Sequence, residues 1–442
     1  MRLPWVMNVI SNVGVRAYYR VTIAGARVPS DGPVLLVANH NNSLVDPALV
    51  VVAADRIVRF LAKAPLFSDK LIGWLVKGVG SVPVYRQQDD PTKVLQNLDS
   101  FRDVHAVLAG GDAVGIFPEG ISHSSSSLAP LKTGAARIAI GAGQRIGHDF
   151  PIIAVGLVFR DRNDFRSEAH VIISEPFRWN DLLEKGVEDR DAVRALTRRI
   201  EGAMRAVTVN LEQWEDEPLV RAAEQVWTAE FKVREGDAAA EVERIRMTTD
   251  ALQALRTGGD GDWRALAADL RAHVDELEEF GLTPAHLDGN VRIGEAVEWT
   301  VARLPFAVVL PISLLGALWF WVPKRLTKVG ADRMSATEGQ DTLVTHRVLI
   351  GGVVFGLWML LGAAATWWLL GLGWALLSLV VQPVWAFTAL LVGERRQRAW
   401  EAAQRYFLRR REKPRIEELR ERQRELATRL DRLYTRIVAS TP

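Results

Sequence analysis

Cysteine is absent from this sequence of 442 residues, so a disulfide framework, a thiol nucleophile and a cysteine-based zinc site are excluded. An excess of charge of one sign is also lacking. The 55 lysines and arginines nearly balance 53 aspartates and glutamates, which leaves a formal net charge of +2 and no argument for a nucleic-acid partner. The N-terminal apolar stretch is broken by Asn8, Ser11 and Asn12. We therefore expect no signal peptide and a catalytic part that faces the cytosol.

The pattern of apolar residues divides the chain into an N-terminal amphipathic helix (1–20), an α/β part (21–180), a charged helical region of unknown role (181–300), membrane segments (301–393) and a basic helical tail (394–442). The α/β part alternates apolar runs with helical patterns, which is typical of an α/β sandwich. The predicted strands are Val34–Ala38, Val58–Leu61, Val82–Val84, Ala113–Phe117, Ile152–Val158 and His170–Ile173, and the clearest predicted helix covers 92–108.

Three long uncharged stretches lie in the last third of the chain, at 304–322, 348–370 and 374–393, and each has about the length needed to cross a bilayer. The loop 323–347 and the segment after Gly393 are rich in lysine and arginine, which favours the cytoplasmic side. If only the second and third stretches cross, both basic segments stay on that side. We therefore expect a transmembrane hairpin, with 304–322 interfacial or re-entrant. This predicts an integral protein of the cell membrane with its catalytic domain on the cytosolic face.

The basic tail repeats apolar residues at a spacing of three or four, from Ile416 to Ile437. This pattern predicts either a short coiled coil or a helix packed on the catalytic domain. The second is favoured because three heptads are short for a coiled coil.

A histidine and a carboxylate stand close together in the block Asn39-His40-Asn41-Asn42-Ser43-Leu44-Val45-Asp46-Pro47. Six steps on an ideal helix rotate by about 240°, so a contact between His40 and Asp46 requires a turn between them. The residues Asn41-Asn42-Ser43 have the chemistry of a turn. Asp followed by Pro is also a typical helix start, so Asp46 could instead be a helix cap, unless Ser43 takes that role.

Two further blocks follow, Gly80-Ser81-Val82-Pro83-Val84-Tyr85-Arg86 and then Phe117-Pro118-Glu119-Gly120-Ile121-Ser122-His123, with Pro130-Leu131-Lys132-Thr133-Gly134-Ala135-Ala136-Arg137 behind them. In this order and at these distances the blocks resemble the glycerolipid acyltransferase superfamily over roughly residues 15 to 180. The residues of the last two blocks are most similar to those of the glycerol-3-phosphate acyltransferase branch. The usual signature has four residues between His and Asp, whereas this sequence has five; a similar longer spacing occurs in the fungal type of that branch.

Acyl transfer from a thioester needs a base for the hydroxyl proton of the acceptor, and histidine suits this task. His40 is the predicted general base, and Asp46 would orient its ring. Arg86 is the first candidate for the phosphate, because a guanidinium group binds phosphate in a forked geometry. Glu119 would bind the glycerol hydroxyl or anchor a basic residue, and Gly120 lets the backbone come close. Lys132 and Arg137 could also face the phosphate. No metal and no cofactor are expected.

The predicted function is a membrane-bound O-acyltransferase that moves a fatty acyl group from acyl-CoA or acyl-carrier protein to glycerol-3-phosphate in phospholipid synthesis. One alternative acceptor is 1-acylglycerol-3-phosphate (lysophosphatidic acid), which would give phosphatidic acid. A phospholipid-remodelling transacylase and a catalytically silent membrane scaffold are alternatives of other classes. The intact set His40, Asp46, Arg86 and Glu119 argues against the scaffold.

Overall fold

The protein was analysed as a computed structural model, which describes residues 4–69, 72–85, 97–123, 127–210, 216–231, 242, 244–249, 262–287, 304–339 and 342–440. The chain forms two compact units. The first consists of residues 1–214, 236–246 and 335–348, and the second of 215–235, 247–334 and 349–442. The first unit is therefore discontinuous in sequence, because its last segment follows some ninety residues of the second unit.

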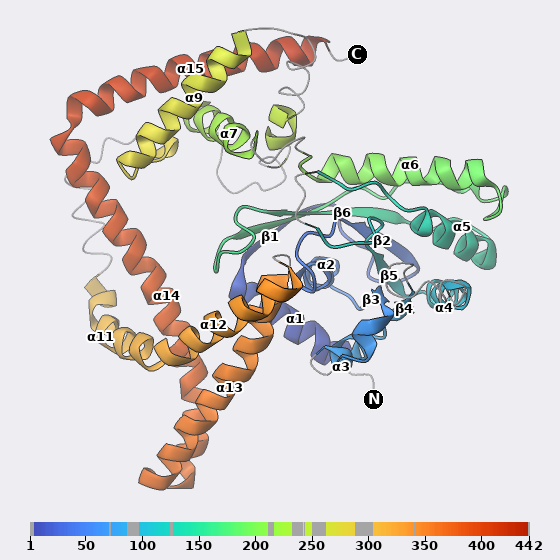
Figure 1. Cartoon of the computed structure of the whole chain (residues 1–442), viewed down its shortest axis with the longest axis horizontal. Helices are drawn as coiled ribbons and strands as arrows, with labels where there is room; N and C mark the ends of the chain where they lie inside the picture. Colours follow the sequence, from blue (N-terminus) through green and yellow to red (C-terminus); the bar gives the residue numbers. More distant parts are fainter. Residues whose placement is uncertain are drawn as a thin grey trace. The chain divides into compact units, whose positions relative to one another are not determined.

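A mixed sheet of seven strands forms the centre of the first unit, in the order β1-β7-β6-β2-β5-β3-β4 (Figure 1). All neighbouring strands are parallel except β6 and β7. The strands are β1 (Arg20–Gly25), β2 (Val34–Ala38), β3 (Val58–Lys63), β4 (Val82–Val84), β5 (Ala113–Ile116), β6 (Ile152–Phe159) and β7 (Glu168–Ile173).

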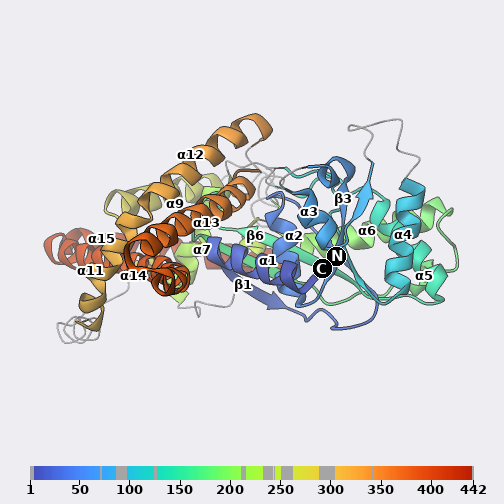
Figure 2. The same cartoon turned by 90° about the horizontal axis from the view of Figure 1, so that it is seen from below.

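Helices cover both faces of this sheet, and the central strand β2 shows how the core is divided (Figure 2). Leu35 and Val37 belong to one buried apolar cluster, with α4 (Asn97–Ala109), α5 (Gly134–Ile146) and α6 (Arg190–Val207). Val34, Leu36 and Ala38 belong to the other, with α1 (Pro4–Tyr18) and α2 (Val45–Ala54). All five β2 side chains are buried, as expected for a central strand with a helical layer on each face.

The predicted α/β sandwich is confirmed, and each of the six predicted strands is present to within about two residues at either end. The sequence analysis missed β1, which pairs with β7 at the edge of the sheet. The helix predicted over 92–108 is α4, and its first predicted residues lie outside the described ones. Short helices complete the unit: η1 (Ala64–Phe67), α3 (Gly73–Gly78) and η3 (Asn180–Leu182).

The region 181–300 is not one structural body. Helix α6 packs on the catalytic sheet, because Ala192, Leu196, Ile200 and Met204 bury one of its faces in the first core cluster. Helices α7 (Glu217–Phe231) and α9 (Asp262–Glu279), with η5 (Pro284–His286), belong to the second unit.

The C-terminal helix α15 (Lys413–Ser440) packs on α7 and α9 of the second unit. Leu419 and Ile416 lie in a cluster with Leu277 and Leu282, and the Trp227 indole donates to Asp431 at 3.3 Å. The prediction that the tail packs on the catalytic domain was therefore wrong. The apolar stripe was read correctly, but the partner surface is made by helices whose sequence gives no indication of tertiary contact.

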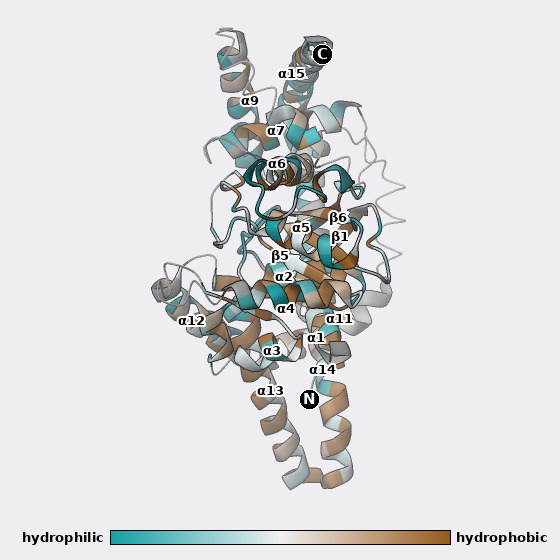
Figure 3. Cartoon of the chain, turned by 90° about the vertical axis from the view of Figure 1, so that its right-hand side faces the viewer, coloured by the Kyte–Doolittle hydropathy of each residue, from teal (hydrophilic) through white to brown (hydrophobic). Residues whose placement is uncertain are grey.

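Helices α13 (Leu343–Leu370) and α14 (Leu372–Arg411) are long and apolar enough to cross a membrane over residues 343–370 and 372–397. They run side by side as a hairpin of mostly hydrophobic residues (Figure 3), and the Gln382 amide donates to the Met359 carbonyl at 3.0 Å. The turn is Gly371, at φ +93°, within the predicted connection. Helices α11 (Leu304–Trp319) and α12 (Trp321–Glu338) precede them. Pro311 lies inside α11 without ending the helix.

Candidate active site

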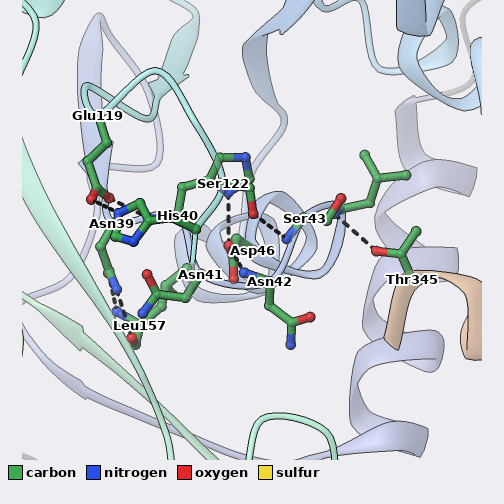
Figure 4. Close-up of polar contacts among 12 residues, drawn as sticks. Asn39, His40, Asn41, Asn42, Ser43, Asp46, Glu119, Ser122, Leu157 and Thr345 are labelled. Carbon is green, nitrogen blue, oxygen red and sulfur yellow. Dashed lines mark hydrogen bonds and ion pairs between the residues drawn. The ribbon is translucent and has the colours of Figure 1, made fainter. Parts of the chain in front are cut away.

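His40 follows the carboxyl end of β2, where the preceding residue fixes the strand to its neighbour. The buried Asn39 side chain donates to the Leu157 carbonyl at 3.0 Å and accepts from the Leu157 N–H at 2.7 Å (Figure 4). This pair of bonds extends the pairing of β2 with β6 through a side chain. His40 therefore leaves the sheet from a defined point.

The His40 ring contacts Asp46 across a tight turn, with 2.9 Å between Nδ1 and Oδ2. The same Oδ2 accepts the N–H of Asn42 at 2.6 Å. The backbone bends back at Ser43, whose φ of +43° is uncommon for a residue other than glycine. This left-handed residue brings the carboxylate under the ring in spite of the six-residue separation. Asp46 is thus both a first-turn residue of α2 and the partner of His40.

The bond to Asp46 and the burial of this carboxylate determine which nitrogen of the His40 ring is available to a substrate. The Asp46 side chain is fully buried, whereas 20% of the His40 side chain is exposed. Because a carboxylate accepts, Nδ1 carries the hydrogen of this bond, so the lone pair of the neutral ring lies on Nε2. The Phe117 ring stacks on the imidazole, with 4.1 Å between centroids and 16° between planes. The arrangement presents a basic nitrogen with its orientation fixed from behind and from one face.

Glu119 is the second buried carboxylate of the site, and it binds backbone rather than an arginine or lysine. Oε1 accepts the His40 N–H, and Oε2 accepts the Ala129 N–H, each at 2.8 Å. Oε2 also contacts His123 Nε2, and the His123 N–H donates to the His40 carbonyl at 3.1 Å. The side chain of Glu119 therefore joins three segments of the site. Such buried bonds to a charge are stronger than bonds between neutral groups.

Gly120 follows in a left-handed conformation, at φ +73°. The aliphatic part of Lys132 crosses it so closely that a Cβ at position 120 would stand 2.5 Å from Nζ and 2.8 Å from Cδ and Cε. The Lys132 N–H donates to the Pro118 carbonyl at 2.8 Å, which fixes the base of the side chain. Within the described part of the chain, its exposed ammonium group has no carboxylate partner. Gly120 therefore makes room for a cation.

The other two predicted phosphate ligands are placed differently. Arg137, in the first turn of α5, donates from Nη1 to the Val187 carbonyl at 3.3 Å and so has a structural partner. Arg86 lies outside the described residues, so its role stays a prediction from the sequence. In the described ranges, no group of three or more histidine, aspartate or glutamate side chains could hold a metal ion.

Sequence analysis missed the residues that support the site from behind. Tyr19, with a ring 1% exposed, accepts from the Asn42 amide at 2.8 Å and donates to the Arg162 carbonyl. Burial raises the pKa of the Tyr19 phenol, so the hydroxyl keeps its proton and can donate. Ser122 and Thr345 accept backbone N–H groups of the same turn. Apart from the position of Ser122 in the block that contains Glu119, no local signal in the sequence indicates these roles.

The geometry agrees with the comparisons to known proteins. Residues 20–158 match the family model described as Acyltransferase, and this range contains His40, Asp46, Glu119 and Lys132. The chain contains an acyltransferase domain. This domain is of the glycerolipid acyltransferase type, as the order of the motifs indicated.

Relatives of the acyltransferase domain fall into two groups. Glycerol-3-phosphate O-acyltransferase 1 of Saccharomyces cerevisiae is 25% identical over 261 residues, covering 55% of this chain and 34% of its own length. Glycerol-3-phosphate O-acyltransferase 2 of the same yeast is 31% identical, covering 30% and 18%. A 1-acyl-sn-glycerol-3-phosphate acyltransferase of Chlamydomonas reinhardtii is 32% identical, covering 34% and 43%. The chain thus spans less than half the length of these relatives.

Among solved structures, the chain is similar to the 1-acyl-sn-glycerophosphate (LPA) acyltransferase PlsC from Thermotoga maritima. The two are 20% identical, and the match covers 46% of this chain and 78% of that one with a TM-score of 0.34.

Proposed function

We propose that this protein is a glycerol-3-phosphate O-acyltransferase in which His40 is the general base. The observation that carries the proposal is the fixed His40–Asp46 pair, with Nδ1 bound at 2.9 Å and 20% of the His40 side chain exposed. The glycerolipid acyltransferase domain supplies the reaction class. The long His–Asp spacing and the likeness to the two yeast glycerol-3-phosphate acyltransferases favour the unacylated acceptor.

The proposed reaction is a direct transfer. His40 Nε2 takes the proton of the acceptor hydroxyl as its oxygen attacks the carbonyl carbon of the thioester, and a C–O bond forms. The buried Asp46 carboxylate stabilises the imidazolium ion and holds the ring in place. The tetrahedral adduct then expels the thiolate by breaking its C–S bond. The thiolate receives the proton from His40, so the products are an ester and a free thiol.

The phosphate of the acceptor requires a cation near the base. Lys132 fits this role, because its exposed ammonium group lies over Gly120 next to Glu119, the residue that fixes the His40 backbone. Arg86 remains the second proposed phosphate ligand. Arg137 is a weaker candidate, because the Val187 carbonyl already binds its guanidinium group. Glu119 acts as an anchor in this proposal: its two oxygens bind the backbone of 40 and 129 and leave little capacity for a substrate hydroxyl.

We also propose that α13 and α14 cross the cell membrane as a hairpin, with the catalytic domain on the cytosolic side. The support is their length, the absence of charged residues from 348–370 and 372–393, and the 6% buried share of the most apolar part of α13. Helix α11, at 16 residues, is short for a bilayer, which favours the interfacial or re-entrant position. The lysines and arginines of α12 and of the second half of α14 favour the cytosolic side for the segments that flank the hairpin.

A second candidate is the acylation of 1-acylglycerol-3-phosphate, because relatives of that kind match the same domain. The test measures thiol release from palmitoyl-CoA by the detergent-purified protein, with either acceptor and with an acyl-carrier-protein donor as a further arm. We expect release with glycerol-3-phosphate. Release with the monoacyl form alone would assign the second acylation, and release with neither acceptor from either donor would contradict both and favour a thioester-independent transacylase.

The catalytic role of His40 is tested in the same assay. His40→Ala should lower kcat by about 100-fold or more, the contribution expected of a general base. His148→Ala is the matched control, because His148 is an exposed histidine of the same unit that bonds only to the neighbouring Asp149 carbonyl among the contacts found. Equal activities of the two variants would contradict the assignment of His40.

A further inference from the structure

The catalytic turn, defined here as residues 40–45, has four successive backbone N–H groups that are all bound. The Asn42 N–H donates to Asp46, at 2.6 Å, and the Val45 N–H donates to the Asn42 carbonyl, at 3.0 Å. The two N–H groups between them donate to side chains outside the turn. That of Ser43 donates to Ser122 Oγ at 3.3 Å, and that of Leu44 donates to Thr345 Oγ1 at 3.2 Å (Figure 4).

These two hydroxyls bind the backbone just before the first residue of α2, a helix that has no side-chain cap. Leu44 occupies the cap position, and an apolar side chain cannot accept an N–H group at the start of a helix. The turn also contains Ser43 in a strained, left-handed conformation that persists only when the surroundings hold it. The hydroxyls of Ser122 and Thr345 supply those surroundings from two distant parts of the sequence.

Thr345 can hold the turn because the first residues of α13 are embedded in the catalytic unit. Thr345 is 4% exposed, and its neighbour Val344 is fully buried in the core cluster of α1 and α2. Arg347, two residues after Thr345, donates from Nη1 to the Asn163 carbonyl at 2.5 Å and to the Tyr18 hydroxyl at 3.1 Å. The segment 343–348 is therefore a fixed support rather than a loose connection.

A second route reaches the catalytic turn from the same support. Arg162, next to Asn163, donates from Nη1 to the Asn41 carbonyl at 3.0 Å. Its own carbonyl accepts from the Tyr19 hydroxyl, which in turn binds the Asn42 amide. The loop that α13 fixes through Arg347 thus contacts the turn at two further points.

We propose that Thr345 is a positioning residue, and that its hydroxyl at the base of α13 holds the catalytic turn in the conformation that joins His40 to Asp46. The inference rests on the proposed role of His40 as general base. Loss of the hydroxyl leaves the Leu44 N–H without its acceptor, and the strained Ser43 can then relax and move His40 away from its oriented position.

The test compares three variants of the full-length protein. Thr345→Val keeps the shape of the side chain and removes the hydroxyl, and Thr345→Ser keeps the hydroxyl. Thr342→Val is the control, because the Thr342 hydroxyl binds the carbonyl of Gly339 in its own turn, at 2.7 Å. We expect Thr345→Val to lower kcat about three- to tenfold, the value of one hydrogen bond, with an unchanged KM for the acyl donor. Thr345→Ser and Thr342→Val should stay within twofold of the wild type.

Amide hydrogen exchange of peptides that cover 41–46 measures the protection of the N–H groups of the same turn and needs no substrate. Thr345→Val should exchange faster there, and Thr342→Val should not. Wild-type exchange and activity in Thr345→Val would overturn the inference, as would an equal loss in all three variants, which would indicate general damage to α13. An inactive wild type would contradict the proposed function, whereas the exchange measurement would still decide the role of the hydroxyl.

Discussion

Replacement of Gly120 by alanine tests whether the position of the Lys132 ammonium group matters for activity, provided that the effect of backbone strain is measured separately. Gly120 and Gly32 both have φ of +73°, so an alanine at either position carries the same left-handed strain of about 1–2 kcal/mol. A Cβ at position 32 meets no heavy atom within 4 Å, whereas a Cβ at 120 would stand 2.5 Å from Lys132 Nζ. Gly32→Ala is therefore the matched control for Gly120→Ala.

The expected magnitudes differ between stability and activity. Lys132 must withdraw by about 1 Å to reach an ordinary contact of 3.4 Å, which its flexible end can do at little cost. Both variants should therefore lower the melting temperature by a similar amount, about 2–8 °C. If the ammonium group binds the acceptor phosphate, its displacement costs a charged hydrogen bond of about 1.5–3 kcal/mol. The KM for the acceptor should then rise about 10- to 100-fold in Gly120→Ala alone.

The assay is thiol release at varied acceptor concentration and saturating acyl-CoA, with thermal unfolding of the same preparations. The KM for acyl-CoA serves as an internal reference, since Lys132 is proposed to contact the acceptor. An acceptor KM that is equal in Gly120→Ala and Gly32→Ala would refute the reasoning, because it would show that the position of Lys132 over Gly120 has no bearing on acceptor binding.

Three further predictions concern the carboxylates and the hairpin. Asp46→Asn removes the charge that faces the His40 ring and should lower kcat about 10- to 100-fold. The control Asp55→Asn, at the exposed end of the same helix, should keep a kcat near that of the wild type. Equal kcat values of the two variants would contradict the role of Asp46. Glu119→Gln has one acceptor oxygen for two buried N–H groups and should lower the melting temperature by several degrees, a loss that an unchanged unfolding curve would rule out. Because the chain lacks cysteine, Gly373→Cys introduces a unique thiol, and an impermeant maleimide should label it in intact cells. The thiol of Lys413→Cys should react only after permeabilisation. The reverse labelling pattern would invert the proposed orientation.

The sequence predicted well those parts of the fold that depend on local patterns. The strands Val34–Ala38 and Val82–Val84 were predicted at their observed bounds, because short apolar runs between turn residues identify strands. Strand β1 was missed, since Arg20–Gly25 is only half-buried and its pairing with Glu168–Ile173 is nearly 150 residues away in the chain. An edge strand with mixed burial lacks the periodic signal of a central one.

In the candidate site, too, some features could be predicted from the local sequence and others could not. The residue types of the His40 and Glu119 blocks gave the chemistry, and they indicated that Asp46 needed a turn to reach the ring. The solution to that turn, Ser43 at positive φ, could not be predicted, because serine has no local preference for this conformation. Thr345 was equally hidden: a threonine in an apolar helix carries no sign of a contact with a backbone three hundred residues earlier.

The discontinuity of the first unit has a consequence for biosynthesis. The ribosome completes 1–214 long before it adds 335–348, the segment that places Val344 in the core and Thr345 on Leu44. That segment is also the beginning of the first long apolar helix of the chain. The nascent domain therefore lacks part of its core until that helix emerges. If α13 and α14 cross the membrane as proposed, the catalytic turn is completed at the stage when the chain enters the bilayer. The order of synthesis would then delay completion of the catalytic turn until the chain reaches the membrane.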